Sequence, residues 1–565
     1  MEISEGMIYP FGATIWNGGV NFSVAVESGR ECRLCLYRNK EKKPFQTLCL
    51  PERKGHGTVR SVRIDGIPLK GLEYQYLVQG EPLLDPYAWA ISGREVWGEE
   101  PEETGKVRGK VVADTYDWEE DEPLRIPYED VVAYSLHVRG FTKHASSKVK
   151  RRGTFAGVAE KIPYFQSLGI NQIHLMPVYE FEENGTYRNY WGYGPAFWFA
   201  PKASYAGKGG DPVRELKELV KKCHASGIEV VLNLPFMSGV SYSMIVDCIR
   251  YYVMEYHIDG VIVNPYCAPF EELRKDPLLA YTKVLKQQED FQNTMRRFLK
   301  GDEGMVESVM WWLRHISGED GIYNYVTSHT GFTLYDLVSY DRKHNELNGE
   351  KNQDGPEYNY SWNCGAEGAS RKKAVMELRK HQIKNAFLLL LMAQGTPCIL
   401  AGDEFLNSQK GNNNVYCQDN ETGWLNWLKE GEEHWLFRYV KDLIAFRKKH
   451  PVLHCSEELA GMDRIASGVP DISYHGESAW QTPSEVSSRQ LGVYYYGEAF
   501  GDTGCFAAYN MHWLSHSFAL PSLRKGKKWY LAVSTNEGVL QEEILLENQK
   551  EVIVDERTIC IFIAK

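Results

Sequence analysis

A helix pattern near the middle of the chain runs directly into a strand pattern, and this junction limits the possible folds. Asp211 and Pro212 favour the first turn of a helix, and apolar residues follow at helical spacing until Gly227. Residues 228–232 (Ile-Glu-Val-Val-Leu) then form a short apolar run typical of a buried strand. A helix that ends just before a buried strand is the repeating unit of an α/β fold with a parallel sheet.

The same alternation of strands and helices extends over residues 129–450. Strand patterns occur at residues 131–138 and 169–178, and the apolar run 261–263 is typical of a strand that is buried on both faces. We therefore predict a (β/α)8 TIM barrel over residues 129–450. Functional side chains of this fold lie at the carboxyl ends of the strands, so the loops after the strands are the candidate site.

Short strands separated by turn residues flank the predicted barrel on both sides. With 565 residues, the chain is long enough for three domains. Residues 1–95 predict an N-terminal β-sandwich, and residues 451–565 predict a C-terminal β-sandwich. Residues 96–128 are acidic and contain Pro101 and Pro123, which indicates a linker along the surface.

Composition narrows the possible partners and the compartment. The formal net charge of −11 argues against nucleic acid or an anionic membrane as a partner. The amino terminus has no basic segment followed by an apolar one, and no window approaches a membrane span, so we expect a cytoplasmic protein. The 12 cysteines match no disulfide framework and no zinc-ligand spacing, and we expect neither metal nor cofactor.

The segment 256–266 (Tyr-His-Ile-Asp-Gly-Val-Ile-Val-Asn-Pro-Tyr) carries the first resemblance to a known family. It is similar to the fourth barrel strand of the α-amylase clan, glycoside hydrolase family 13, in the isoamylase and glycogen-debranching branch, whose pattern is H-x-D-G-F-R-F-D. Three positions are identical: His257, Asp259 and Gly260. Ile262 stands where the family has an arginine, and Asn264 stands where it has the nucleophilic aspartate.

Two other catalytic positions implied by the resemblance also hold neutral residues. Residues 282–288 align with the fifth strand, T-K-L-I-A-E-P-W, and place Gln287 at the general acid. The seventh strand keeps His329 but has Thr330 at the transition-state-stabilising aspartate. Residues 233–238 (Asn-Leu-Pro-Phe-Met-Ser) replace the family's D-V-V-Y-N-H. An amide is a very poor nucleophile and cannot form the glycosyl intermediate of a retaining mechanism.

The alignment at Gln287 has an alternative register, because a short loop follows it. A shift of one or two residues would bring Glu289 or Asp290 near the site. An acid without a nucleophile would still supply only a small part of the rate enhancement, because general acid–base catalysis alone increases the rate on the order of 10²- to 10⁴-fold. We therefore predict no meaningful glycosidase turnover.

Other motifs of the family are retained, including loop signatures at residues 344–368, 395–404 and 411–421. The opening strands of residues 1–95 resemble a carbohydrate-binding module of family 48. The resemblance implies a substrate-binding set of Tyr193, Trp191, His329, His257 and Trp424, with Tyr193 stacking on the sugar at the cleavage subsite. The alternative for Tyr193, Trp424 and His329 is that they remain only as packing residues in a fold whose site has closed.

Three functional hypotheses follow from the resemblance. The first is a non-hydrolytic member of the branch that binds α-glucan (glycogen, starch or maltooligosaccharide) or acts as partner of an active debranching enzyme. The alternative is an active α-1,6-glucosidase that debranches glycogen or starch with acids outside the aligned positions. The third is a structural protein that binds neither glucan nor enzyme.

Overall fold

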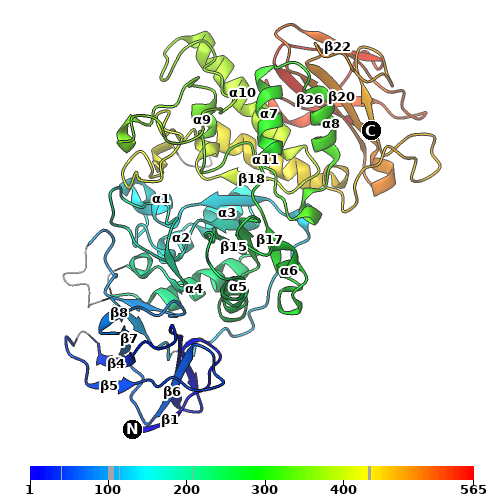
Figure 1. Cartoon of the computed structure of the whole chain (residues 1–565). Coiled ribbons are helices and arrows are strands. Elements are labelled where there is room, and N and C mark those ends of the chain that lie inside the picture. The colour runs from blue at the N-terminus through cyan, green and yellow to red at the C-terminus, as the bar shows by residue number, and fades with distance from the viewer. Residues whose placement is uncertain (40, 100–106, 114, 208, 430–433) are drawn as a thin grey trace. The chain divides into compact units, whose positions relative to one another are not determined.

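The computed structural model describes residues 1–39, 41–99, 107–113, 115–207, 209–429 and 434–565 (Figure 1). These residues form two compact units. The first unit comprises Met1–Pro123, His137–Ile162 and Leu175–Thr282, and the second comprises Leu124–Leu136, Pro163–His174 and Lys283–Lys565.

Two antiparallel sheets form a β-sandwich at the start of the first unit, drawn in dark blue in Figure 1. One sheet has the order β1 (Glu2–Glu5), β6 (Val59–Asp65), β3 (Gly19–Ala25), β2 (Gly12–Trp16). The other has the order β5 (Gln46–Cys49), β4 (Cys32–Arg38), β7 (Leu72–Val78), β10 (Arg108–Lys110), β9 (Ile91–Ser92), and β8 (Glu81–Leu83) pairs with β7. Phe22, Leu36 and Tyr76 are fully buried in the shared core, which explains the alternating apolar pattern of these strands.

The predicted linker is partly built into this sandwich. Residues 108–110 form β10 between β7 and β9. Further on, the Trp118 ring stacks on His257 at 3.9 Å, and Asp121 accepts hydrogen bonds from His224 and His257. The rest of the prediction, including Pro101, concerns residues 100–106 and 114, which lie outside the described residues. The described part of this segment is therefore packed rather than free.

The barrel elements of the first unit include two parallel strands, β15 (Glu229–Leu234) and β16 (Gly260–Val263), with Leu232 opposite Val261. The helices are α1 (Val138–Lys143), α2 (Phe155–Ala159), α4 (Pro212–His224), α5 (Tyr242–Tyr256) and α6 (Phe270–Arg274). The Asp211 side chain caps α4 by accepting from the Val213 amide at 3.1 Å, and Gly227 has φ +71° before β15. The helix–strand unit predicted from residues 211–232 is confirmed.

The second unit has the same alternation. Its barrel strands are β11 (Ala133–Leu136), β12 (Gln172–Leu175), β17 (Lys283–Leu285) and β18 (Cys398–Leu400), and β11 pairs with β18 in parallel. Parallel bridges join Lys286 to Ile322 and Asn324 to Pro397. The helices are α3 (Ile162–Leu168), α7 (Asp290–Lys300), α8 (Val306–Arg314), α9 (Leu334–Leu337), α10 (Lys373–Leu391) and α11 (Trp435–Lys449).

Residues near the carboxyl terminus form the C-terminal β-domain of the second unit. Six antiparallel strands have the order β19 (Ile472–His475), β20 (Gln490–Tyr495), β21 (Gly504–Asn510), β26 (Thr558–Ala564), β23 (Trp529–Ser534), β24 (Gly538–Leu545). A two-stranded sheet adds β22 (His516–Ala519) and β25 (Glu551–Val554). Phe506, Trp529 and Phe562 pack in the core of this domain.

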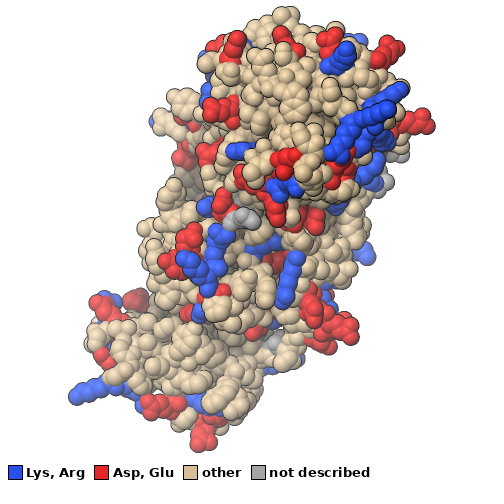
Figure 2. Space-filling model, turned by 90° about the vertical axis from the view of Figure 1, so that its right-hand side faces the viewer, with Lys and Arg blue, Asp and Glu red and all other residues tan. Residues whose placement is uncertain are grey.

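Charges of both signs are interspersed on the face drawn in Figure 2. In the part of the chain that the structure describes, we find no helix with the length and apolar content needed to cross a membrane.

Candidate functional site

In the first unit, Asn264 occupies the first position after β16. The residue is exposed, and its side-chain oxygen accepts a hydrogen bond from the Tyr266 amide at 3.0 Å. Its carbonyl oxygen accepts from the amides of Cys267 and Ala268 at 3.0 and 2.9 Å. This is the pattern of an Asx turn, in which asparagine bonds its own loop. The side chain at the carboxyl end of β16 is therefore an uncharged amide whose oxygen is already hydrogen-bonded.

The Tyr193 side chain is connected to the same end of this parallel pair. Its hydroxyl oxygen accepts from the Asn233 amide at 3.3 Å, and Asn233 lies opposite Ile262 in the register of β15 and β16. Burial raises the pKa of the Tyr193 hydroxyl, so it stays protonated. The Trp191 ring lies 5.8 Å from the Tyr193 ring. Tyr193 thus presents a half-buried ring with a fixed polar tip.

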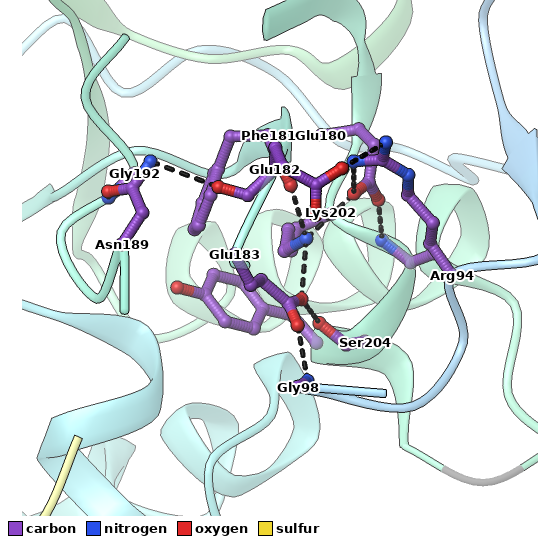
Figure 3. Close-up of polar contacts among 12 residues, drawn as sticks. Arg94, Gly98, Glu180, Phe181, Glu182, Glu183, Asn189, Gly192, Lys202 and Ser204 are labelled. Atoms are coloured by element: carbon purple, nitrogen blue, oxygen red, sulfur yellow. Dashed lines mark hydrogen bonds and ion pairs between the residues drawn. The ribbon is translucent and has the colours of Figure 1, made fainter. Parts of the chain in front are cut away.

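A buried ionic cluster anchors the hairpin of β13 (Tyr179–Phe181) and β14 (Ala196–Pro201) on either side of Tyr193 (Figure 3). The fully buried Lys202 ammonium donates to Glu180 at 2.7 Å and to the Phe181 carbonyl at 2.8 Å, and it lies 2.7 Å from Glu183. Glu183 also accepts from Ser204 and from the Gly98 amide. All three ammonium hydrogens have acceptors, so this buried charge is compensated.

Asn189 sets the conformation of the turn that carries Tyr193 (Figure 3). Its side-chain oxygen accepts from the Gly192 amide at 2.9 Å, and its side-chain nitrogen donates to the carbonyl oxygens of Tyr193 at 2.9 Å and Glu182 at 3.1 Å. Gly192 has φ +84°, and a Cβ there would overlap the Phe181 ring. The motif of residues 189–193 therefore has a structural reason for both its asparagine and its glycine.

In the second unit, Gln287 and Thr330 lie together. The Gln287 amide donates to Thr330 Oγ1 at 3.5 Å and to Ser328 Oγ at 3.4 Å, and the two hydroxyl oxygens are 3.1 Å apart. His329 lies between the two hydroxyl residues in sequence, and burial lowers its pKa to about 4. The imidazole is therefore neutral at pH 7. The side chains of Gln287, Ser328 and Thr330 form an uncharged, hydrogen-bonding group.

Sequence comparisons place this chain among known proteins. The α-amylase catalytic domain model matches residues 137–236. Isoamylase 1 of Arabidopsis thaliana chloroplasts is 32% identical, with 94% of this chain and 85% of that protein aligned. The chain belongs to the isoamylase and glycogen-debranching branch of glycoside hydrolase family 13. The glycogen debranching enzyme of Erwinia tasmaniensis is 33% identical over 80% of this chain and 85% of that protein.

Solved structures of this branch's fold are also similar. Pullulanase type I from Bacillus subtilis, solved with maltose, superimposes with a TM-score of 0.75 at 19% identity, covering 98% of this chain and 85% of that one. The predicted α/β class, a TIM barrel flanked by β-domains, is confirmed.

The structure separates some of the residues that the family resemblance grouped together. His257 precedes β16 and lies at its amino end, whereas Asn264 follows the carboxyl end. The His257 ring stacks on Trp118, and its Nδ1 is 2.7 Å from Asp121. This histidine therefore packs against the predicted linker, and we leave it out of the proposed glucan site.

Trp424 and the acids of the alternative register have other surroundings. The Trp424 indole donates to Asp419 at 2.8 Å within its own loop. Glu289 is exposed just before α7. Burial raises the pKa of Tyr325 and lowers the pKa of Arg296 to about 10, and the negative charge of Glu289 adds a smaller upward contribution to both. Asp290 accepts from Gln288. It is Gln287 that donates to Thr330, while Glu289 remains a nearby negative charge.

Three residues were not predicted as site residues from the sequence: Ser328, which accepts from Gln287; Asn233, which donates to the Tyr193 hydroxyl; and Tyr266. The Tyr266 ring is 93% exposed on the loop that begins at Asn264. Its place just after a barrel strand was the available signal, since such loops form the site in this fold.

Proposed function

We propose that this member of the isoamylase and debranching branch binds α-glucan without hydrolysing it. The observation that carries the proposal is the neutral group of Gln287, Ser328 and Thr330, together with the amide of Asn264 held in its turn. A retaining glycosidase needs a carboxylate nucleophile and a carboxylic acid about 5–5.5 Å apart. Amides and hydroxyls can bond sugar hydroxyls but supply neither role.

The side chains that suit a neutral sugar support the binding half of the proposal. Sugar affinity comes from ring stacking and a few placed hydrogen-bonding groups, none of which needs a charge. Tyr193 supplies a ring whose turn is fixed by Asn189 and whose hairpin is anchored by Lys202. Asn233 and Gln287 offer amides, and Tyr266 offers an exposed ring.

Two assays on the purified chain test the two halves. Glycogen in a native affinity gel should retard the chain, and Tyr193→Ala should reduce the retardation. Incubation with glycogen limit dextrin should release no reducing ends above the blank. A chain that migrates freely, or a release rate near that of ordinary debranching enzymes, contradicts the proposal.

The second candidate function is debranching hydrolysis, and Glu289 is the observation that favours it. Its negative charge acts on Tyr325 and Arg296, close to Gln287. If the chain is a hydrolase that uses this acid, Glu289→Gln should abolish a measurable release of reducing ends. We expect no release in either protein. The partner role with an active debranching enzyme, glucan binding by residues 1–95 and the cytoplasmic location stay predictions.

A further inference from the structure

A cavity of about 540 Å3 lies in the second unit and is lined by none of the residues discussed above. Its walls come from α10, α11, Glu537 and the start of β24, and Figure 1 labels the two helices. Lys441 of α11 lines it, and so do four other residues of that helix, Trp435, Arg438, Tyr439 and Asp442. Those four are spaced i, i+3, i+4 and i+7, so a single face of that helix forms one wall.

One lysine of the lining, Lys384, connects α10 to the turn before β24. The Lys384 ammonium of α10 donates to the carbonyl oxygens of Thr535 at 2.9 Å and Asn536 at 3.0 Å. It lies 5.3 Å from the centre of the Tyr439 ring and 5.9 Å from that of the Trp435 ring. The turn that carries Glu537 is therefore tied to α10, and the cavity walls are held in place before any ligand binds.

The lining combines an aromatic ring with hydrogen-bonding groups of both kinds. Lys384, Arg438 and Lys441 are donors, Asp442 and Glu537 are acceptors, and the Gln541 side chain is both. The Lys384 ammonium already donates to two carbonyl oxygens, and the remaining charged groups are two cations, Arg438 and Lys441, and two carboxylates, Asp442 and Glu537. Charges of the two signs are therefore balanced among these four groups, which favours a neutral ligand over an anion or a cation. A neutral polyhydroxyl molecule satisfies donors and acceptors together and offers a flat face to the indole.

We infer that this cavity is a second carbohydrate-binding site, in which Trp435 stacks on a sugar ring and Arg438, Asp442, Glu537 and Gln541 bond its hydroxyl groups. The volume is within the range of small-ligand pockets, roughly 300–1,000 Å3. The carbohydrate class comes from the chemistry of the cavity itself. Its assignment to α-glucan, rather than to another neutral sugar, rests on the proposed function.

Equilibrium dialysis of labelled maltoheptaose against the full chain tests this site. We expect two binding sites in the original chain and one in Trp435→Ala. In glycogen affinity gels, Trp435→Ala should weaken binding about 3- to 10-fold, the size expected for one stacking ring. Trp513→Ala is the matched control, because that tryptophan is 54% exposed, belongs to the same unit and does not line the cavity. It should bind like the original chain.

The outcomes separate this inference from the proposed function. The inference is overturned if Trp435→Ala still has two sites. It is also overturned if inorganic pyrophosphate displaces maltoheptaose from the site that Trp435→Ala removes. If Tyr193→Ala still has two sites and Trp435→Ala has one, the second site stands and the proposed role of Tyr193 fails. Glu537→Gln and Gln541→Ala provide variants if Trp435→Ala does not fold, and they should each lower the affinity of the same site.

Discussion

At the scale of single residues, the neutral side chains at the predicted catalytic positions are hydrogen-bonded groups. Asn264 bonds its own loop, and Gln287 bonds Ser328 and Thr330. Each of these hydrogen bonds is one that an amide or a hydroxyl can form without a charge. In each unit, these side chains are donors and acceptors that suit a neutral ligand.

Restoring carboxylates at these positions should therefore recover little activity. We expect the triple variant Asn264→Asp, Gln287→Glu, Thr330→Asp to remain slower than an active isoamylase by roughly 10⁴-fold or more, as single losses from a cooperating catalytic set do. Ile262 still stands where the family has arginine, and residues 233–238 still differ from the family motif. The rate at which reducing ends are released from limit dextrin measures the activity of the variant. A rate within tenfold of that of an isoamylase would show that the missing carboxylates are the only reason for the lost activity.

The buried ion pairs of Lys202 predict a large effect of its substitution on stability. Lys202→Met leaves Glu183 buried without this cation and leaves Glu180 with Arg94 alone, at 3.8 Å, and breaking such a pair costs about 3–5 kcal/mol. Urea unfolding should show this loss of stability. The control is Lys222→Met, whose side chain is 60% exposed and 3.9 Å from Glu218, so its ion pair is worth about 0–1 kcal/mol. Equal effects of the two substitutions would contradict the account.

At the scale of elements, alanine substitutions of two glycines in the turn after β13 distinguish a steric clash of the new side chain from strain of the backbone. Gly192 has φ +84°, and its Cβ position overlaps the Phe181 ring, whereas Gly194 has φ +117° with open space around it. Both alanine substitutions carry backbone strain of about 1–3 kcal/mol. Gly192→Ala should in addition displace the turn and reduce glycogen retardation. Gly194→Ala should lose stability but keep more of the retardation, and the reverse order would disprove the role of this turn.

The sequence predicted elements best where local signals agreed with the fold. The capped helix α4, its stop at Gly227 and the strand β15 were predicted because capping, periodicity and strand propensity all point the same way. Strand β10 was missed, because its three residues, Arg-Gly-Lys, have no strand pattern and pair only through their neighbours β7 and β9. His257 was included in the substrate-binding set from the family resemblance, although its position before the apolar run 261–263 already places it at the amino end of that strand.

The candidate site was predictable only in part for a related reason. Asn264, Gln287 and Thr330 were identified by alignment with a family pattern, which gives positions but no contacts. The Gln287–Thr330 hydrogen bond joins residues 43 positions apart, and the Tyr193–Asn233 bond joins residues 40 apart. Such pairs depend on how the strands are arranged, and no local pattern shows them.

At the scale of the whole molecule, buried histidines make stability depend on pH. Burial lowers the pKa of His174 to about 3, from an ordinary value near 6.5 in the unfolded chain. Between these values the unfolded chain binds a proton that the folded chain does not, so stability falls as the pH falls from about 6.5 to 3. His174→Asn should reduce the slope of unfolding free energy by about 1.4 kcal/mol per pH unit near pH 5. An unchanged slope would contradict the neutral buried imidazole.

The family relationship spans nearly the whole chain, since 94% of it aligns with isoamylase 1 of Arabidopsis thaliana. The proposal is therefore that a complete debranching-type framework has kept its sugar-facing rings while its reactive positions hold neutral residues.

The most direct test is a long incubation of branched limit dextrin with an equal number of protein chains, followed by a count of new reducing ends per chain. The account predicts none above the blank, while the same preparation is retarded by glycogen in a gel. One or more new reducing ends per chain, lost in Glu289→Gln or in any other carboxylate variant, would show that the chain cleaves its glucan.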